Sequence, residues 1–182
     1  MSVLKNAIMQ ATHGAIQSLG DLIIGDELPF SLQGIEIGTP TASQFLAQKF
    51  GIVQLESSGL VNAEISLLFD SDSVFQILQK MLGAEADADM IQECESDAMC
   101  ELGNVVMIRY LSEIADFLHT PLESTLPIYH IESKEEFLNS VDAEKRFIVS
   151  HVDLQIEQHA AEMKMVFSMN HESFDNLVQN LN

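Results

Sequence analysis

The chain has 182 residues, of which 47% are hydrophobic, and this length and composition fit one domain with a sizeable buried core. Its 28 acidic and 8 basic side chains give a formal net charge of −20, which repels phosphate backbones and anionic membrane surfaces alike. Composition therefore argues against nucleic acid and membrane as partners, and it favours a protein that presents Lys or Arg at its contact face.

The first predicted element is a helix over residues 2–20, because apolar side chains recur there at helical spacing and Gly20 follows as a stop. Residues 28–38 alternate apolar and polar side chains, as a half-buried strand does. Residues 51–70 predict two further strands, joined by a Ser-Ser-Gly turn at residues 57–59. The chain thus begins with a helix followed by strands.

Two helices are predicted next. The first is short, with Ser71 or Asp72 as its N-cap and Gly83 as its stop. The second is long and covers residues 88–118, which contain no proline and repeat apolar side chains at helical spacing. Its acidic N-terminal end suits the helix dipole.

The remaining third of the chain predicts strands and one helix. A strand is expected at residues 126–129 and a charged insertion at residues 130–145. Two strands at residues 146–157 and 161–170 follow, and a last helix covers residues 172–181. A plain charged surface loop is the favoured interpretation of the insertion, and a role in partner choice is the alternative.

The end of the chain resembles its middle. The sequence AEISLLF at residues 63–69 aligns with AEMKMVF at residues 161–167, at an offset of 98. The same offset pairs Asn6 with Asn104 and Pro29 with Pro127, whereas Val3 falls at the position of Glu101. Chance similarity of two strand–helix units is the alternative, but the shared Asn and Pro favour a duplication.

A duplication predicts a single domain over residues 1–182, made of a degenerate half at about 1–84 and a second half at about 88–182. The expected fold class is α+β, with two pseudo-symmetric halves that form one antiparallel β-sheet packed against long helices.

Three polar side chains share one face of the long predicted helix. Asp97, Glu101 and Asn104 are spaced so that they fall within roughly a 60° arc, opposite the apolar face. Asn is a poor helix former, which makes its place here notable. A solvated helix face that happens to carry an Asn is the plain alternative, and the spacing alone does not exclude it.

Along the chain, three residues stand between Asp97 and Glu101, two between Glu101 and Asn104, and twenty-two between Asn104 and Pro127. In these residues and spacings the chain resembles the CheC/CheX/FliY family of chemotaxis phosphatases, and the ELGN wording of the helix is close to that family's. The resemblance implies a CheC-like fold and hydrolysis of the aspartyl-phosphate of a CheY-like response regulator.

In this family's mode, Glu101 docks on the active-site lysine of the regulator and the amide of Asn104 orients water toward the phosphoryl group. Asp97 and Pro127 are expected to shape the site and contact the partner. No cofactor of its own is implied, because the regulator carries the Mg²⁺. Since Val3 replaces the first glutamate, one active helix is expected, as in single-site CheX-like members, which also makes a homodimer a reasonable expectation.

A second class of function stays open. The chain is alternatively a non-catalytic binding module or scaffold for a response regulator, for a CheD-like protein or for a flagellar-switch protein. A small-molecule enzyme lacks support, because the sequence has neither a glycine-rich phosphate loop nor a GxSxG motif.

The remaining reactive residue types predict little chemistry. Cys94 and Cys100 are six residues apart, which puts them on different faces of a helix, and they are expected to be reduced, core-type thiols. The six histidines are dispersed, so no metal site is expected. The sequence also lacks a long apolar span and a signal-peptide core, so the expected location is the cytoplasm.

Overall fold

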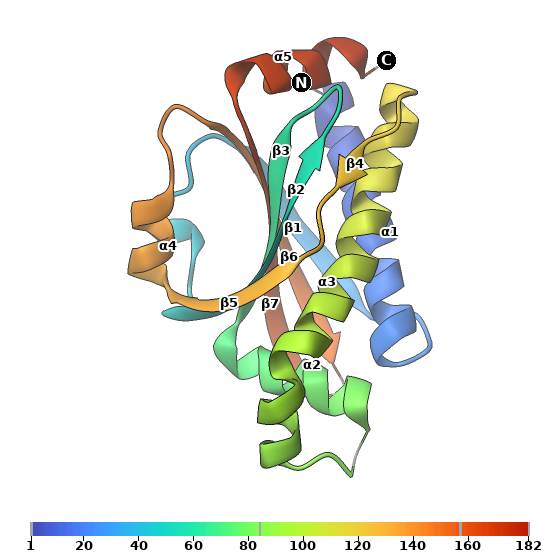
Figure 1. The fold of residues 1–182 in the computed structure, drawn as a ribbon, viewed down its shortest axis with the longest axis vertical. Coiled ribbons are helices and arrows are strands. Elements are labelled where there is room, and N and C mark those ends of the chain that lie inside the picture. The colour runs from blue at the N-terminus through green and yellow to red at the C-terminus, as the bar shows by residue number, and fades with distance from the viewer. Residues whose placement is uncertain (1, 84, 157, 182) are drawn as a thin grey trace.

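The computed structural model describes residues 2–83, 85–156 and 158–181, and it shows one seven-stranded antiparallel sheet with long helices against one face (Figure 1). The predicted α+β class is therefore confirmed. Four predicted borders lie outside the described residues: Met1 and Asn182 of the domain, Ala84 of the first half and Glu157 of a strand. The elements are α1 (Ser2–Ile23), β1 (Phe30–Ile37), the 3-10 turn η1 (Ala42–Gln44), β2 (Lys49–Ser58), β3 (Ala63–Asp70), α2 (Ser71–Leu82), α3 (Ala88–Leu118), β4 (Glu123–Ser124), β5 (Ile128–Ser133), α4 (Lys134–Ser140), β6 (Arg146–Ile156), β7 (His159–Met169) and α5 (His171–Asn180).

The sheet is ordered symmetrically about its centre. Its path runs β1-β6-β7-β3-β2, and β2 pairs at its other side with both β5 and β4. Exchanging β1, β2 and β3 for β5, β6 and β7 leaves this order unchanged when it is read backwards. At the centre, Leu67 of β3 pairs with Met165 of β7, and these two positions are related by the offset of 98. The topology thus has the two-fold order that two similar halves would give, while the duplication and its borders stay predictions.

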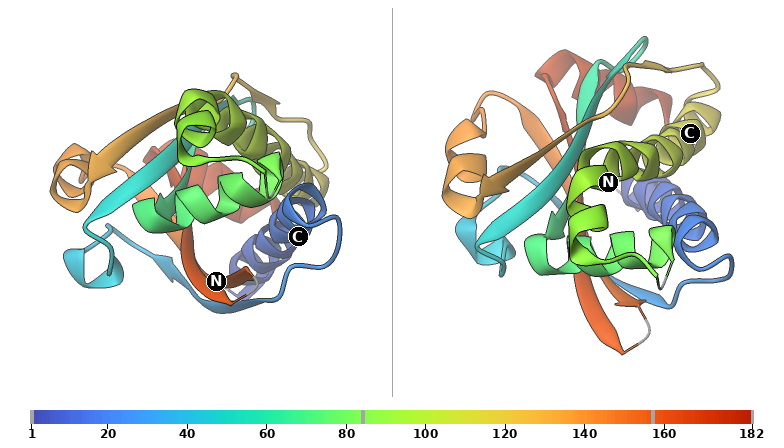
Figure 2. Two further views of the ribbon diagram at one scale, coloured as in Figure 1. Left: turned by 90° about the horizontal axis from the view of Figure 1, so that it is seen from below. Right: turned by 60° about the horizontal axis from the view of Figure 1, so that its bottom comes forward.

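The main core lies between the sheet and the two long helices. Helices α1 and α3 lie side by side over one sheet face, and α4 covers the opposite face (Figure 2). The apolar stripe of α1 is buried as its spacing predicts, at Leu4, Ala7, Ile8, Ala11, Ala15 and Leu19. No helix among the described residues is long and apolar enough to cross a membrane.

The first helix is longer than predicted, because Gly20 is not its stop. A Cβ on Gly20 would lie 2.7 Å from the backbone oxygen of Asp26, so this glycine instead allows the returning chain to pack against the helix. The helix ends at Ile23, and Gly25 with φ 68° supplies the left-handed residue that follows it.

The structure also corrects two predictions for the first half, the N-cap of α2 and the position of the turn between β2 and β3. The N-cap of α2 is Asp70, whose side chain accepts a hydrogen bond from the Ser73 amide at 2.9 Å, and not Ser71 or Asp72. The turn between β2 and β3 begins at Gly59, which has φ 128° and lies beyond the predicted centre of the turn.

The insertion is not a plain loop. Within residues 130–145 the strand β5 continues to Ser133, and the helix α4 follows it directly. The helix begins with a capping box, in which the Ser133 side chain accepts from the Glu136 amide and the Glu136 carboxylate accepts from the Ser133 amide. The strand predicted at 126–129 is displaced along the chain, because β5 starts only at Ile128.

Candidate functional site

The middle of α3 has one buried and one open face. Asp97 and Glu101 are exposed on the open face, and the side chain of Asn104, one turn further, is half-buried. The structure therefore brings three of the four predicted site residues onto one helix surface. The opposite face enters the core with Met99, Leu102, Val106 and Met107.

The polar side chains of the open face are not used within the chain. Among the described residues, neither the Asn104 amide nor the Glu101 carboxylate has a hydrogen-bond or ion-pair partner. The sequence has no Lys or Arg between Lys80 and Arg109, so this part of α3 presents only negative charge. An amide and a carboxylate are thus available to a group that comes from outside.

A glycine sets how deeply the helix lies on the sheet at this point. Gly103 is buried next to Asn104, and a Cβ added to it would lie only 2.2 Å from Cγ1 of Val53 in β2. Helix α3 therefore crosses β2 at a distance that no side chain larger than hydrogen permits. This close approach fixes the height at which Asn104 emerges from the sheet.

A tyrosine ties the same helix to the edge strand. The hydroxyl of Tyr129 in β5 donates a hydrogen bond to Glu95 Oε1 at 2.5 Å. Burial raises the pKa of Tyr129, and its bond to Glu95 raises it further, so the phenol remains protonated over the physiological range. The contact joins α3 to β5 on the N-terminal side of Glu101.

The contact of Tyr129 with Glu95 also constrains the position of Pro127. This proline is half-buried and lies two residues before Tyr129, while Ser124, three residues before it, lines a groove together with Ile108 of α3. Both contacts are with α3, at Glu95 and at Ile108, so Pro127 lies in a segment held against this helix at two points on either side of Glu101 and Asn104. The fourth predicted residue thus belongs to the segment that joins these two contacts.

The segment around Pro127 is open and apolar. Leu126 is 83% exposed and Ile128 is 60% exposed, although both are large hydrophobic side chains. Ile108, one turn after Asn104 on α3, is 39% exposed. Apolar side chains left in water next to unpaired polar groups are typical of a protein contact surface.

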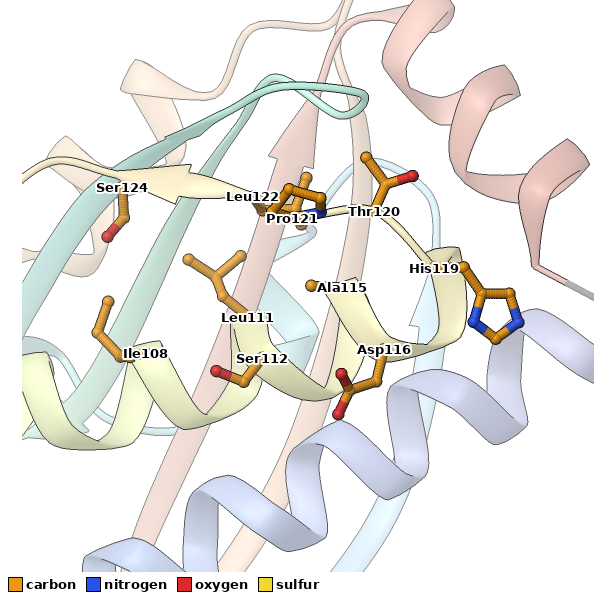
Figure 3. A pocket seen from close by; sticks show the side chains of 10 residues that line it. All are labelled: Ile108, Leu111, Ser112, Ala115, Asp116, His119, Thr120, Pro121, Leu122 and Ser124. Carbon is orange, nitrogen blue, oxygen red and sulfur yellow. The ribbon is translucent and has the colours of Figure 1, made fainter.

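A groove of about 470 Å³ continues the open face toward the C-terminal end of α3. Figure 3 shows Ile108 and Ser124 near one end of it and Asp116 and His119 near the other. His119 has φ 51° and ends the helix, so the chain turns back there to form the second wall. The groove and the polar face form one continuous surface.

The equivalent surface of the first half lacks the acidic residue. Val3 and Asn6 are exposed near the start of α1, and Val3 is 51% exposed. Pro29 is exposed as well, in the segment before β1. A carboxylate is therefore absent at the position that corresponds to Glu101, and the two halves present different chemistry.

Sequence reasoning did not identify Gly103, Glu95 or Tyr129. A lone glycine inside a helical pattern is a weak indication of close packing, so the sequence around Gly103 could have suggested that the helix packs closely there. No sequence signal predicts the hydrogen bond between Tyr129 and Glu95, because it depends on how β5 lies against α3.

The two cysteines differ from the prediction of core-type thiols. Both are free, but Cys94 is exposed and only Cys100 is partly buried. Burial raises the pKa of the Cys100 thiol, the nearby Asp97 carboxylate raises it further, and a hydrogen bond from the Tyr129 backbone partly lowers it.

At about pH 8 we expect Cys94 to react with a thiol reagent such as DTNB at least about tenfold faster than Cys100, because the thiolate is the reacting form. The rates are measured on the single variants Cys100→Ser and Cys94→Ser, each of which retains one thiol. Equal rates in the two variants would contradict the arrangement of this face.

Comparisons of the sequence and of the structure give different results. No family model matches the chain, and no curated protein matches it significantly. Solved structures do match it over nearly their whole length. FliY from Thermotoga maritima is 15% identical and has a TM-score of 0.74, with 98% of this chain and 95% of that chain covered.

Two further structures show the same architecture. The middle domain of FliM from H. pylori is 11% identical, has a TM-score of 0.68, and covers 98% of this chain and 96% of its own. The CheX of a CheX–CheY–BeF3–Mg²⁺ complex from Borrelia burgdorferi is 14% identical, has a TM-score of 0.60, and covers 91% and 97%. The expected CheC-like fold, shared by CheX, FliY and FliM proteins, is therefore confirmed.

Proposed function

We propose that this protein hydrolyses the aspartyl-phosphate of a CheY-like response regulator, with Asn104 as the catalytic residue. The observation that carries the proposal is the unpaired Asn104 amide, half-buried beside the exposed Glu101 on a helix that Gly103 holds against the sheet. The matched CheX that is in complex with CheY supports this choice of partner.

The chemistry needs little from the phosphatase. An aspartyl-phosphate is an activated acyl phosphate, and the regulator supplies the Mg²⁺, so what is missing is an oriented water molecule. A neutral amide suits this task, because it can hydrogen-bond water and still approach the phosphoryl oxygens, whereas a carboxylate there would be repelled. Asn104 can therefore direct water in line with the phosphorus atom without a cofactor in this chain.

Glu101 performs the second task, which is docking. Its carboxylate is exposed three residues before Asn104 and can form a charge-assisted pair with the active-site lysine of the regulator. Asp97 extends the same negative surface, and the exposed Leu126 and Ile128 beside Pro127 add apolar contact area. A basic surface on the regulator complements this combination of charge and apolar side chains.

The variant Glu101→Gln is expected to raise KM for the phosphorylated regulator about tenfold and to leave kcat nearly unchanged, because it removes a docking charge and not the amide. The measurement is phosphate release at increasing regulator concentration, at two salt concentrations. The weaker salt dependence expected of Glu101→Gln follows from the lost ion pair. Glu135→Gln, an equal charge change on α4, is the control and should behave as the parent protein.

A non-catalytic binding module is the second candidate, because the middle domain of FliM has the same architecture. The two functions differ in one measurement. A phosphatase that is present in catalytic amounts shortens the lifetime of the phosphorylated regulator. A binding module binds the phosphorylated form and leaves that lifetime unchanged. A homodimer and a cytoplasmic location stay predictions from the sequence.

A further inference from the structure

The sheet face opposite α1 and α3 has its own cover. The segment around η1 and the helix α4 lie on this face (Figure 2) and bury a second apolar cluster with it. Phe137 of α4 packs on Phe45 with 5.3 Å between ring centroids, and Lys134 Nζ donates to the Phe45 carbonyl at 3.2 Å. Helix α4, within the insertion of residues 130–145, is therefore anchored over the sheet at its N-terminal end.

A cavity of about 310 Å³ remains beneath this cover. Its floor is apolar at Ile52, Phe147 and Val166, which are buried, and Phe137 and Val141 line it from the side of α4. The volume lies at the lower end of the range for small-ligand pockets, about 300–1,000 Å³. The cavity is on the far side of the sheet from Glu101 and Asn104, so it is separate from the proposed phosphatase site.

One polar group in the floor has no partner. Ser168 is only 3% exposed, and its Oγ forms no hydrogen bond within the described part of the chain. A buried hydroxyl left unpaired costs about 1–3 kcal/mol, so a ligand that satisfies it gains binding energy. Ser66, 4% exposed, also lines the floor of the cavity on the neighbouring strand β3.

The charges around the cavity favour a cation. Glu64, Glu132 and Asp142 line it, against the single ammonium of Lys145, which lies 4.0 Å from Glu64. His130, the remaining titratable group there, lies 3.2 Å from Glu132. With three carboxylates and one ammonium, the lining is net negative, and an anion would meet both this lining and the overall charge of −20.

We propose that this cavity binds a small amine, a ligand with one ammonium group and an apolar body, under α4. The ammonium pairs with the carboxylate of Glu64, a polar atom of the ligand reaches Oγ of Ser168, the residue paired with Glu64 across β3 and β7, and the apolar body lies on Val166. The inference does not depend on the proposed phosphatase activity, because the residues that carry it face the other side of the sheet.

The test uses tyramine as the probe, since it combines an ammonium, an aromatic ring and a hydroxyl for Ser168. Titration of the full chain, followed by calorimetry and by amide NMR shifts, should give saturable binding with shifts confined to β3, β7, α4 and their neighbours on this face. 3-(4-Hydroxyphenyl)propionate, with a carboxylate in place of the ammonium, should bind at least about tenfold more weakly.

Variants separate the cavity from general effects. Ser168→Ala and Glu64→Gln should each weaken tyramine binding about fivefold or more. Ser150→Ala is the matched control, because Ser150 is equally buried but its hydroxyl contacts Thr12 on the helix side. Asn104→Ala should bind tyramine as the parent protein does. The proposal is overturned if tyramine does not bind saturably, if the propionate binds equally well, or if Ser168→Ala binds no more weakly than Ser150→Ala.

Discussion

Replacing Asn104 with alanine is expected to lower the rate at which this protein dephosphorylates a CheY-like regulator by about 100-fold or more. The loss of one positioned hydrogen-bonding group at a reacting centre has an effect of this size. KM should change little, because Glu101 and the apolar segment beside Pro127 are intact. Decay of the phosphorylated regulator, followed at saturating regulator concentration, measures the effect on kcat directly.

The first half of the chain supplies a matched control. Asn6 is exposed on α1 and corresponds to Asn104 at the offset of 98, but Val3 stands where the docking glutamate would be. Asn6→Ala should therefore leave the rate unchanged. Equal losses in Asn6→Ala and Asn104→Ala would show two active helices, and no loss in Asn104→Ala would overturn the assignment of Asn104 as the catalytic residue. Asn104→Asp should be as inactive as Asn104→Ala, since its added charge repels the phosphoryl group.

Much of the fold can be predicted because local sequence patterns determine it. The long helix α3 follows from the spacing of its apolar residues, and the stop of α2 follows from Gly83, which has φ 96°. The pairing of Leu67 with Met165 at the sheet centre agrees with an offset read from the sequence alone. These features depend on near neighbours or on repeated sequence, and both are visible without coordinates.

The errors arise where a residue responds to a distant part of the chain. Gly20 resembles a helix stop, but its lack of a side chain serves the approach of Asp26 and Leu28. The insertion resembles a charged loop; its capping box at Ser133 is a local signal, but the packing of Phe137 on Phe45 depends on a distant segment. Tertiary contacts of this kind override local propensity.

The candidate site divides in the same way. Asp97, Glu101 and Asn104 share a helix face because of their spacing, which a sequence reports directly. That Pro127 lies in a segment held against the same helix depends on the bond of Tyr129 to Glu95 and on the groove at Ile108, and neither follows from spacing. The depth of the helix on the sheet depends on Gly103 and Val53, which are fifty residues apart in the chain.

Gly103→Ala is expected to destabilise the protein by about 1–3 kcal/mol, even though alanine favours a helix over glycine by about 1 kcal/mol. The new methyl group would lie 2.2 Å from Val53 Cγ1, so either the helix or the strand must move. Urea unfolding measures the change in the free energy of unfolding. Gly14→Ala is the control, because the atoms nearest to its methyl group would belong to the flexible side chains of Glu113 and Arg109, at 3.1 Å and 3.2 Å, and it should be neutral or stabilising.

The double variant Gly103→Ala, Val53→Ala tests the cause of this loss, because it removes the atoms that the new methyl group would strike. Its loss in free energy of unfolding should be smaller, by at least about 1 kcal/mol, than the sum of the losses in the two single variants, as for residues in direct contact. Additive losses would mean that Gly103 matters for another reason than its approach to Val53. Phosphatase activity should follow the same pattern, low in Gly103→Ala and partly restored in the double variant, since the depth of α3 on β2 decides where Asn104 meets the regulator.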